Sequence, residues 1–193
     1  MDCESGFKYV KTYYSNEGKE FCLRPSTSSD LDLIVKNINT VCDEKYVLHT
    51  NEFILTSEWQ YVLKNSVDVK KGDLLIVAES NKNVVGHLRL FPEWYGQKGR
   101  HVGIIGIVIL EPWRKMGIGS AMMRYAIEWS KLAKFEKLTA SVISSNRGAI
   151  NLFKKFNFII EGVRRKQFLI DQTYFDEFLM GRFILKNDHD CAQ

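Results

Sequence analysis

The sequence predicts a single domain of the mixed α+β class, with a central, mostly antiparallel sheet of about seven strands. Two observations support this prediction. Short apolar runs typical of strands alternate with longer segments in which apolar residues recur at helical intervals. The 193 residues also contain no shift in composition that marks a linker, as expected of one well-buried domain. The predicted order is strand, two helices, three antiparallel strands, helix, strand, helix and two strands.

The composition excludes several classes of protein. With 45% hydrophobic and 26% charged residues, the chain lies in the ordinary globular range. No apolar run approaches the roughly 18 to 20 residues that a membrane span needs, and the first residues lack the apolar segment of a signal peptide. We therefore expect a soluble, cytoplasmic protein with no membrane partner. The four cysteines and four histidines are scattered, which argues against a metal site and a disulfide framework.

The formal net charge of +4 is mild, and basic residues are interleaved with acidic ones. No long basic patch is present, so a nucleic-acid partner is not expected. The charge suits an anionic ligand, although an ordinary solvated surface is the simpler interpretation.

The first third of the chain predicts a hairpin followed by helices. Residues 7–24 place two apolar or aromatic runs around a turn at 16–19, and the second run is expected to be the first strand of the main sheet. Residues 28–30 supply capping side chains for a helix whose apolar face begins at Leu31. A second helix is suggested by Trp59, Val62 and Leu63, while 44–55 reads as a loop.

The middle of the chain predicts three strands in a meander. Residues 74–78 and 84–91 flank a turn at 81–83, which favours an antiparallel hairpin. Gly86 within the second strand indicates a bulge or a close backbone approach. The third strand, 104–110, is an apolar run interrupted only by Gly106 and is expected to be buried on both faces.

The last third predicts a helix, a strand, a short helix and two strands. Apolar residues between 122 and 133 lie on one helical face, and the strand expected at 137–144 follows this crossover, so it should run parallel to 104–110. The short helix begins near Asn146 and should end in a left-handed residue at Asn157. Two strands are expected at 158–163 and 174–184, with a turn near Asp171-Gln172.

The segment between the strand 104–110 and the helix at 122–133 predicts an anion site. Its sequence, EPWRKMGIG, contains two glycines where the helix begins, and a helix N-terminus directs backbone N–H groups at a bound phosphate. The spacing is neither the dinucleotide-binding G-x-G-x-x-G nor a Walker loop. An ordinary tight turn between strand and helix is the alternative.

The spacing resembles the R/Q-x-x-G-x-G/A signature of the GCN5-related N-acetyltransferases (GNAT), with Arg114, Gly117 and Gly119 at the three signature positions. A second family stretch, N-x-x-A-x-x-L/F-Y-x-K-x-G-F, is matched at Asn146, Ala149, Lys155 and Phe158. The resemblance spans roughly residues 23–183, and the sequence near 161–180 is similar to the ribosomal-protein and small-amine acetyltransferase subgroups.

The resemblance implies a GNAT-like domain over residues 21–186, with helices on both faces of the sheet and a splayed parallel strand pair at the cofactor site. Residues 1–20 are then an N-terminal extension with a hairpin strand, and 187–193 are a C-terminal tail. The implied cofactor is acetyl-CoA (coenzyme A). The implied cofactor-binding residues are Ile107, Val108, Ile109, Arg114, Lys115, Met116, Gly117, Ile118, Gly119, Ser120, Asn146 and Phe153.

Each group of these residues has an implied role. Backbone groups of 107–109 pair with the pantetheine arm, and amides of 115–120 bind the pyrophosphate. Asn146 hydrogen-bonds the arm from the other side. Phe153 stands where many members have a tyrosine that protonates the leaving thiolate, and phenylalanine has no proton to give.

The implied activity is acetyl transfer to a primary amine, on a protein N-terminus or a small molecule, by direct attack in a ternary complex. The usual positions of a glutamate base hold Ser141, Ile104 and Ile105, so we consider Glu93 and His101 as catalytic bases because they flank the loop into the central strand. The alternative function is a non-catalytic CoA-binding sensor or interaction module. The acceptor, and whether the protein is a monomer or a homodimer, stay open.

Overall fold

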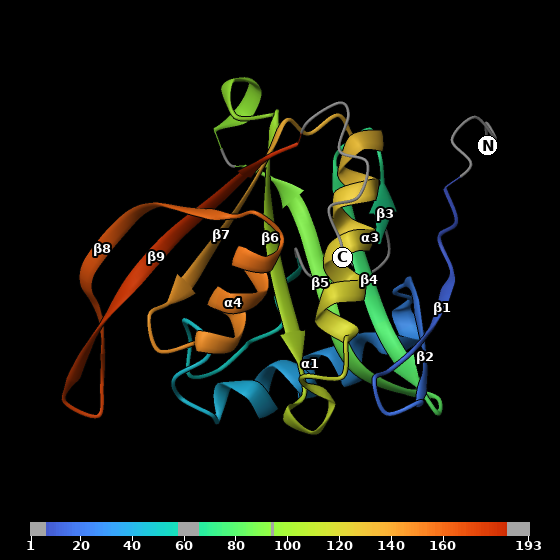
Figure 1. Cartoon of the computed structure of the whole chain (residues 1–193), viewed down its shortest axis with the longest axis horizontal. Helices are drawn as coiled ribbons and strands as arrows, with labels where there is room; N and C mark the ends of the chain where they lie inside the picture. The colour runs from blue at the N-terminus through green and yellow to red at the C-terminus, as the bar shows by residue number, and fades with distance from the viewer. Residues whose placement is uncertain (1–6, 58–65, 94, 185–193) are drawn as a thin grey trace.

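The computed structural model describes residues 7–57, 66–93 and 95–184, which form one nine-stranded sheet flanked by helices (Figure 1). The strand order is β1-β2-β4-β5-β6-β7-β9-β8, with β3 paired to β4. The strands are β1 (Lys11–Tyr14), β2 (Glu20–Pro25), β3 (Val67–Asp68), β4 (Asp73–Ser80), β5 (Asn83–Pro92), β6 (Val102–Ile109), β7 (Lys137–Ile143), β8 (Ile159–Ile170) and β9 (Thr173–Phe183). The helices are α1 (Leu31–Cys42), α3 (Ile118–Leu132) and α4 (Arg147–Lys155).

The sheet confirms the predicted class, and the described elements follow the predicted order apart from the added strand β3. Only β6 and β7 pair in parallel among the strands described, and every other pair is antiparallel. The sheet has nine strands where about seven were predicted. The two-residue β3 was not foreseen, and β1 pairs with β2 at one edge of the same sheet. The helix suggested by Trp59, Val62 and Leu63 and the tail 187–193 lie outside the described residues.

The two faces of the sheet bury separate apolar clusters. On one face, strand residues such as Leu88 and Ile105 pack with Met122 and Trp129 of α3, which crosses in front of β4 and β5 in Figure 1. On the other face, alternate residues of β4 pack against Ile34, Ile38 and Cys42 of α1. This alternation follows from the two-residue period of a strand, and it confirms helices on both faces.

Gly86 allows β5 and β6 to approach closely. A Cβ built at this position lies 2.7 Å from the carbonyl oxygen of Val108, so a larger residue does not fit without movement. The β4–β5 register also shifts beside it, between Ala78 and Glu79. Both expected properties of Gly86, a bulge and a close approach, are therefore found.

The parallel strands β6 and β7 pair only over their first residues. Partners exist for Val102, Gly103 and Ile104, and the two strands then separate, as Figure 1 shows. β6 continues to Ile109 and keeps its pairing with β5 on the other side. The expected splayed pair is thus present, and beyond Ile104 one edge of β6 has no partner among the described strands.

The C-terminal hairpin is longer than predicted. β8 was expected to end at residue 163 but continues to Ile170, and the turn at Asp171 and Gln172 has positive φ at both residues. The hairpin extends away from the rest of the sheet (Figure 1), and most of β8 is exposed on both sides. Such a strand needs no alternation of apolar and polar residues, so its sequence pattern was not recognisable. Asn157 has φ 60°, as expected for the end of α4.

Candidate functional site

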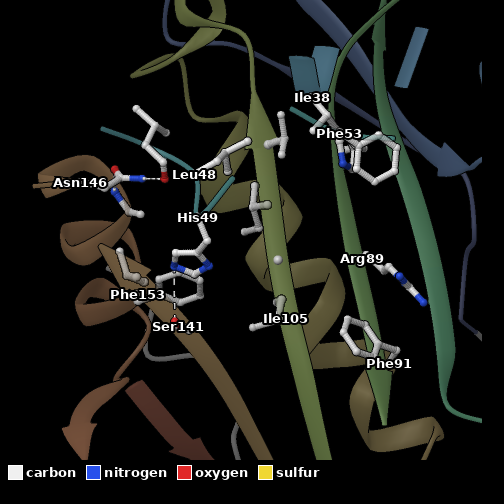
Figure 2. Close-up of a pocket in the computed structure, with 17 residues that line it drawn as sticks. Ile38, Leu48, His49, Phe53, Arg89, Phe91, Ile105, Ser141, Asn146 and Phe153 are labelled. Atoms are coloured by element: carbon white, nitrogen blue, oxygen red, sulfur yellow. Dashed lines mark hydrogen bonds between the residues drawn. The ribbon is translucent and has the colours of Figure 1, made fainter. Parts of the chain in front are cut away.

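The gap between β6 and β7 opens into a cavity of about 320 Å³ (Figure 2). Its walls come from α1, the segment after α1, the strands β5, β6 and β7, and α4. The lining residues are Ile38, Val47, Leu48, His49, Phe53, His87, Arg89, Phe91, Ile105, Gly106, Ile107, Val108, Ser141, Val142, Asn146, Ala149 and Phe153. The separation of β6 and β7 leaves this space, and segments that are distant in sequence meet around it.

The loop from β6 into α3 has the geometry expected of an anion site. Gly117, with φ 92°, is the left-handed residue immediately before Ile118, where α3 begins. The first N–H groups of any helix lack intrahelical acceptors, and they carry its positive dipole end. Lys155 of α4 adds a positive charge nearby, since its Nζ lies 3.4 Å from Oγ of Ser120. These groups together favour a bound phosphate.

Two distant segments hold this loop in place. The N–H of Asn16 donates to the carbonyl of Met116 at 3.2 Å, and its side-chain Nδ2 donates to the carbonyl of Lys115 at 3.2 Å. Arg114 donates through Nε to the carbonyl of Ile109 and through both terminal nitrogens to Glu44, at 2.6 Å each. Arg114 therefore fixes the loop, and its charge is paired with a carboxylate.

The exposed edge of β6 provides backbone groups along the cavity. Ile105 and Ile107 point toward the α3 face, whereas Gly106 and Val108 point toward the α1 face. A Cβ built on Gly106 meets no atom within 4 Å, so this residue keeps the α1 side of the cavity open. Ile109 is not part of the lining and instead lies beside Gly119.

Asn146 and Phe153 both line the cavity, but the Asn146 side chain is engaged within the protein. Its Oδ1 accepts from the N–H of Ala149 at 3.0 Å and caps α4, while its Nδ2 donates to the carbonyl of Val47 at 3.1 Å. In this structure Asn146 thus joins α4 to the segment after α1. Phe153 is 5% exposed and packs edge-on against Phe158.

The structure does not bring Glu93 or His101 to this cavity. Glu93 lies just after β5, where its N–H donates to the carbonyl of Val102. His101 is exposed before the start of β6 and lines a second cavity with Lys70, Arg100 and Lys134. Both residues are at the opposite end of β6 from the glycine loop. Neither residue lines the cavity between β6 and β7.

A polar cluster on the α1 side of the cavity was not predicted from the sequence. The hydroxyl of Ser141 donates to Oε1 of Glu177, and its Oγ lies 3.4 Å from Nε2 of His49 (Figure 2). Arg164 donates to the second carboxylate oxygen of Glu177 at 2.9 Å. Three of the cluster's side chains come from β7, β8 and β9, and His49 comes from a stretch predicted as loop. No short spacing connects them, so no motif indicated the cluster.

The pKa of Glu177 is lowered although its side chain is almost completely buried. Burial alone raises a carboxyl pKa, but the hydrogen bonds from Ser141 and Arg164 and the Arg164 charge outweigh it. Glu177 is therefore ionised at neutral pH and accepts hydrogen bonds only.

The wall formed by β5 combines two nitrogen-bearing side chains with one aromatic ring. His87, Arg89 and Phe91 point to the same side, and the Arg89 guanidinium carbon lies 4.3 Å from the centre of the Phe91 ring. Burial lowers the pKa of His87 to about 4, so this ring is neutral at pH 7. Among the described residues that line the cavity there is no aspartate or glutamate.

Comparison with known protein families identifies a matching domain. The model of the acetyltransferase (GNAT) family matches residues 38–158. Among the described residues, no helix is both long and apolar enough to cross a membrane.

Two curated proteins and two solved structures illustrate the similarity. The chain is 30% identical to the L-amino acid N-acetyltransferase AaaT of Escherichia coli, over 73% of this chain and 82% of that protein. It is 28% identical to an N-alpha-acetyltransferase of Sulfolobus acidocaldarius, over 70% and 78% of the two chains. A GNAT acetyltransferase structure from Streptococcus pneumoniae matches with a TM-score of 0.75 and 25% identity, covering 85% and 99%. The structure of yncA, a putative acetyltransferase from Salmonella typhimurium solved with its cofactor acetyl-CoA, matches with a TM-score of 0.76 and 14% identity, covering 89% and 99%.

Proposed function

Because this chain belongs to the GNAT acetyltransferase family, we propose that it transfers the acetyl group of acetyl-CoA to a small primary amine with an apolar remainder. The observation that carries the proposal is the cavity in the β6–β7 splay, where the edge of β6 that β7 leaves unpaired meets apolar side chains such as Leu48 and Phe53. The named relatives are N-acetyltransferases, so an enzyme is favoured over a non-catalytic CoA-binding module.

The residues present fit acetyl-CoA. Amides of 115–120 would hold the pyrophosphate, with Lys155 as an additional cation, and the unpaired edge of β6 at 107–109 would pair with the amide-bearing pantetheine arm. When bound, the thioester supplies an activated acyl group. The protein aligns a neutral amine against it, and such proximity is worth up to roughly 7 to 11 kcal/mol in favourable cases.

The cavity wall supports an acceptor with an apolar remainder. A polyamine needs carboxylates to pair its several charges, and the described lining residues include none. Phe53, Phe91 and Leu48 instead offer apolar contact to an amino-acid-sized molecule. The name of the Escherichia coli relative, an L-amino acid N-acetyltransferase, agrees with this chemistry. A protein N-terminus is the second candidate, favoured by the name of the Sulfolobus acidocaldarius relative.

The test is an acceptor panel. Purified protein is incubated with acetyl-CoA and L-leucine, L-phenylalanine, spermidine or a short peptide with a free N-terminus, while a thiol reagent reports released CoA and mass spectrometry identifies the product. We expect amine-dependent thiol release to be fastest with an apolar amino acid. Tight binding of acetyl-CoA by calorimetry, together with no thiol release on any amine, would count against the transferase proposal.

We also propose that the N-terminal hairpin belongs to the cofactor site, because Asn16 supports the glycine loop. Asn16→Ala removes the side-chain hydrogen bond to Lys115 and is expected to weaken CoA binding by about 3- to 10-fold, in line with the loss of one hydrogen bond. Isothermal titration calorimetry with CoA measures the change. Glu17→Ala, in the same exposed turn, is the control and should leave the affinity unchanged. Equal affinities of the Asn16→Ala variant and the wild type would contradict this role.

A further inference from the structure

We propose that His49 is the general base that takes the proton from the acceptor amine, and that Ser141 and Glu177 are positioning residues for its ring. The proposal rests on the proposed transferase function and adds to it a residue that the sequence analysis did not consider. Among the described residues, His49 is the only histidine that both lines the cavity and contacts a buried carboxylate through a bridging hydroxyl.

Several contacts place His49 at the cavity. The carbonyl of Tyr46 accepts from Oγ of Ser145 at 2.9 Å, and the carbonyl of Val47 accepts from Asn146, so the backbone just before His49 is tied to the β7–α4 turn. Its ring also stacks on Phe168 of β8, with centroids 5.2 Å apart and an interplanar angle of 3°. The ring is therefore held from two sides although it lies on a loop.

Two contacts to the turn of the β8–β9 hairpin also support the segment that carries His49. Lys45 forms an ion pair with Asp171 at 3.0 Å, and the hydroxyl of Tyr46 donates to the same carboxylate at 2.9 Å. Both contacts are exposed, so each contributes little to stability. They nevertheless connect the turn of the hairpin to the segment that carries His49.

The hydrogen bonds determine which ring nitrogen is basic. Ionised Glu177 can only accept, so the single hydroxyl proton of Ser141 is donated to it. The Ser141 oxygen must then accept from His49, which requires the proton of the neutral imidazole to be on Nε2. Nδ1 is left with a lone pair, and within the described part of the chain it has no hydrogen-bond partner. This nitrogen is the one available to take a proton.

Ser141 and Glu177 are on the same face of the sheet for a simple reason. Ser141 pairs with Leu179 across β7 and β9, and Glu177 is two residues from Leu179, so both side chains project from one face. The distance of 3.4 Å from Ser141 to His49 is long for a hydrogen bond, as is common for catalytic contacts before substrate is bound.

Charged and titratable groups on each neighbouring strand affect His49. Glu177 on β9 favours the imidazolium, Arg164 on β8 partly offsets that carboxylate, and Arg89 and neutral His87 on β5 line the same cavity. The protein packed around the ring lowers the pKa of His49 below its ordinary value, and Glu177 acts in the opposite direction. His49 is thus unprotonated at neutral pH, and the carboxylate stabilises the charge that it gains during the reaction.

In the proposed step one bond forms, one bond breaks and one proton moves to His49. The amine nitrogen forms a bond to the acetyl carbonyl carbon, and the carbon–sulfur bond breaks with its electron pair remaining on sulfur. The proton lost from nitrogen goes to Nδ1 of His49, which later releases it to solvent, and the thiolate takes one proton from solvent. The products are the N-acetyl amine and CoA thiol, with His49 returned to its neutral form.

The kinetic test uses the best acceptor of the panel and acetyl-CoA between pH 5 and 9. His49→Gln should lower kcat by about 10²- to 10⁴-fold and remove the acidic limb of the kcat profile, while binding of CoA by calorimetry is unchanged. Glu177→Gln removes the negative charge, so the limb should move to lower pH. His101→Gln tests the base expected from sequence. A His49→Gln variant within about threefold of wild-type kcat would overturn the proposal while leaving the transferase function standing.

A second measurement does not depend on turnover. Protein labelled with 15N-histidine is titrated by NMR, with His49→Gln used to assign the resonance. We expect the Nε2–H tautomer, a pKa below about 6.5, and a further decrease in pKa in Glu177→Gln, because loss of the carboxylate disfavours the imidazolium. An Nδ1–H tautomer, or a His49 pKa that does not respond to Glu177→Gln, would overturn the assignment whatever the enzyme acetylates.

Discussion

Gly117→Glu is expected to weaken CoA binding by at least about 100-fold, or about 2.7 kcal/mol. Two physical effects combine at this position. Gly117 has φ 92°, a conformation that L side chains rarely adopt, so any side chain strains the loop. A glutamate also places a negative charge beside the amides at the start of α3, where the pyrophosphate is proposed to bind. Calorimetric titration with CoA measures the loss.

Gly96 offers a matched control for the backbone effect. It also has positive φ, 59°, and a Cβ there meets no atom within 4 Å, but it lies at the opposite end of β6 from the glycine loop. Gly96→Glu should therefore carry similar backbone strain and the same added charge without loss of CoA affinity. If Gly117→Glu binds CoA as tightly as Gly96→Glu, the glycine loop is not the anion site.

Gly106→Leu is expected to lower kcat/KM for the acceptor by about 100-fold or more, because misplacement by about 1 Å has effects of that size on catalysis. Gly106 is exposed in the middle of β6, and a side chain added there would enter the cavity that His49 also lines. A Cβ there meets nothing, so the fold should tolerate a larger residue. The branched side chain instead occupies the space in which the amine must approach. Steady-state kinetics with the best acceptor of the panel measure the loss.

Gly106→Ala is the control that distinguishes the effect of filling the cavity from the effect of restricting the backbone. Alanine restricts the backbone as leucine does but adds one carbon, so its effect should be within about tenfold of wild type. CoA binding by calorimetry should survive in both variants, because neither changes the loop at 115–120. Equal kcat/KM in wild type and Gly106→Leu would show that the amine does not approach through this cavity.

Local patterns in the sequence determined most of the fold. The apolar runs of β4, β5 and β6 and the helical spacing in α3 each depend on a few neighbouring residues, and the pattern of buried positions selects strand or helix. The glycine loop belongs to the same category. Its left-handed residue, its helix start and its place after a strand are all encoded within about a dozen positions.

The predicted end of β8 at residue 163 was wrong, because burial imposes no alternation of apolar and polar residues on the rest of this strand. Residues 164–170 of β8 continue as a strand beyond the body of the sheet, and most of them are exposed, so polar and charged residues fit there as well as apolar ones. The extent of the hairpin was therefore invisible in the sequence. It is nevertheless important, because Arg164 and Phe168 from this segment contact Glu177 and His49.

The sequence by itself determined the class of fold, the parallel pair and the glycine loop before α3, where we propose that the pyrophosphate binds, because each follows from local periodicity or from a short spacing. Only the tertiary structure decided which side chains meet at the cavity. Glu93 and His101 are near the central strand in sequence but lie at its far end, whereas His49, Ser141 and Glu177 are separated by 92 and 36 residues and still form one cluster. Pairing of the strands decides such contacts, because side chains from β7 and β9 project from one face only when the two strands pair in register.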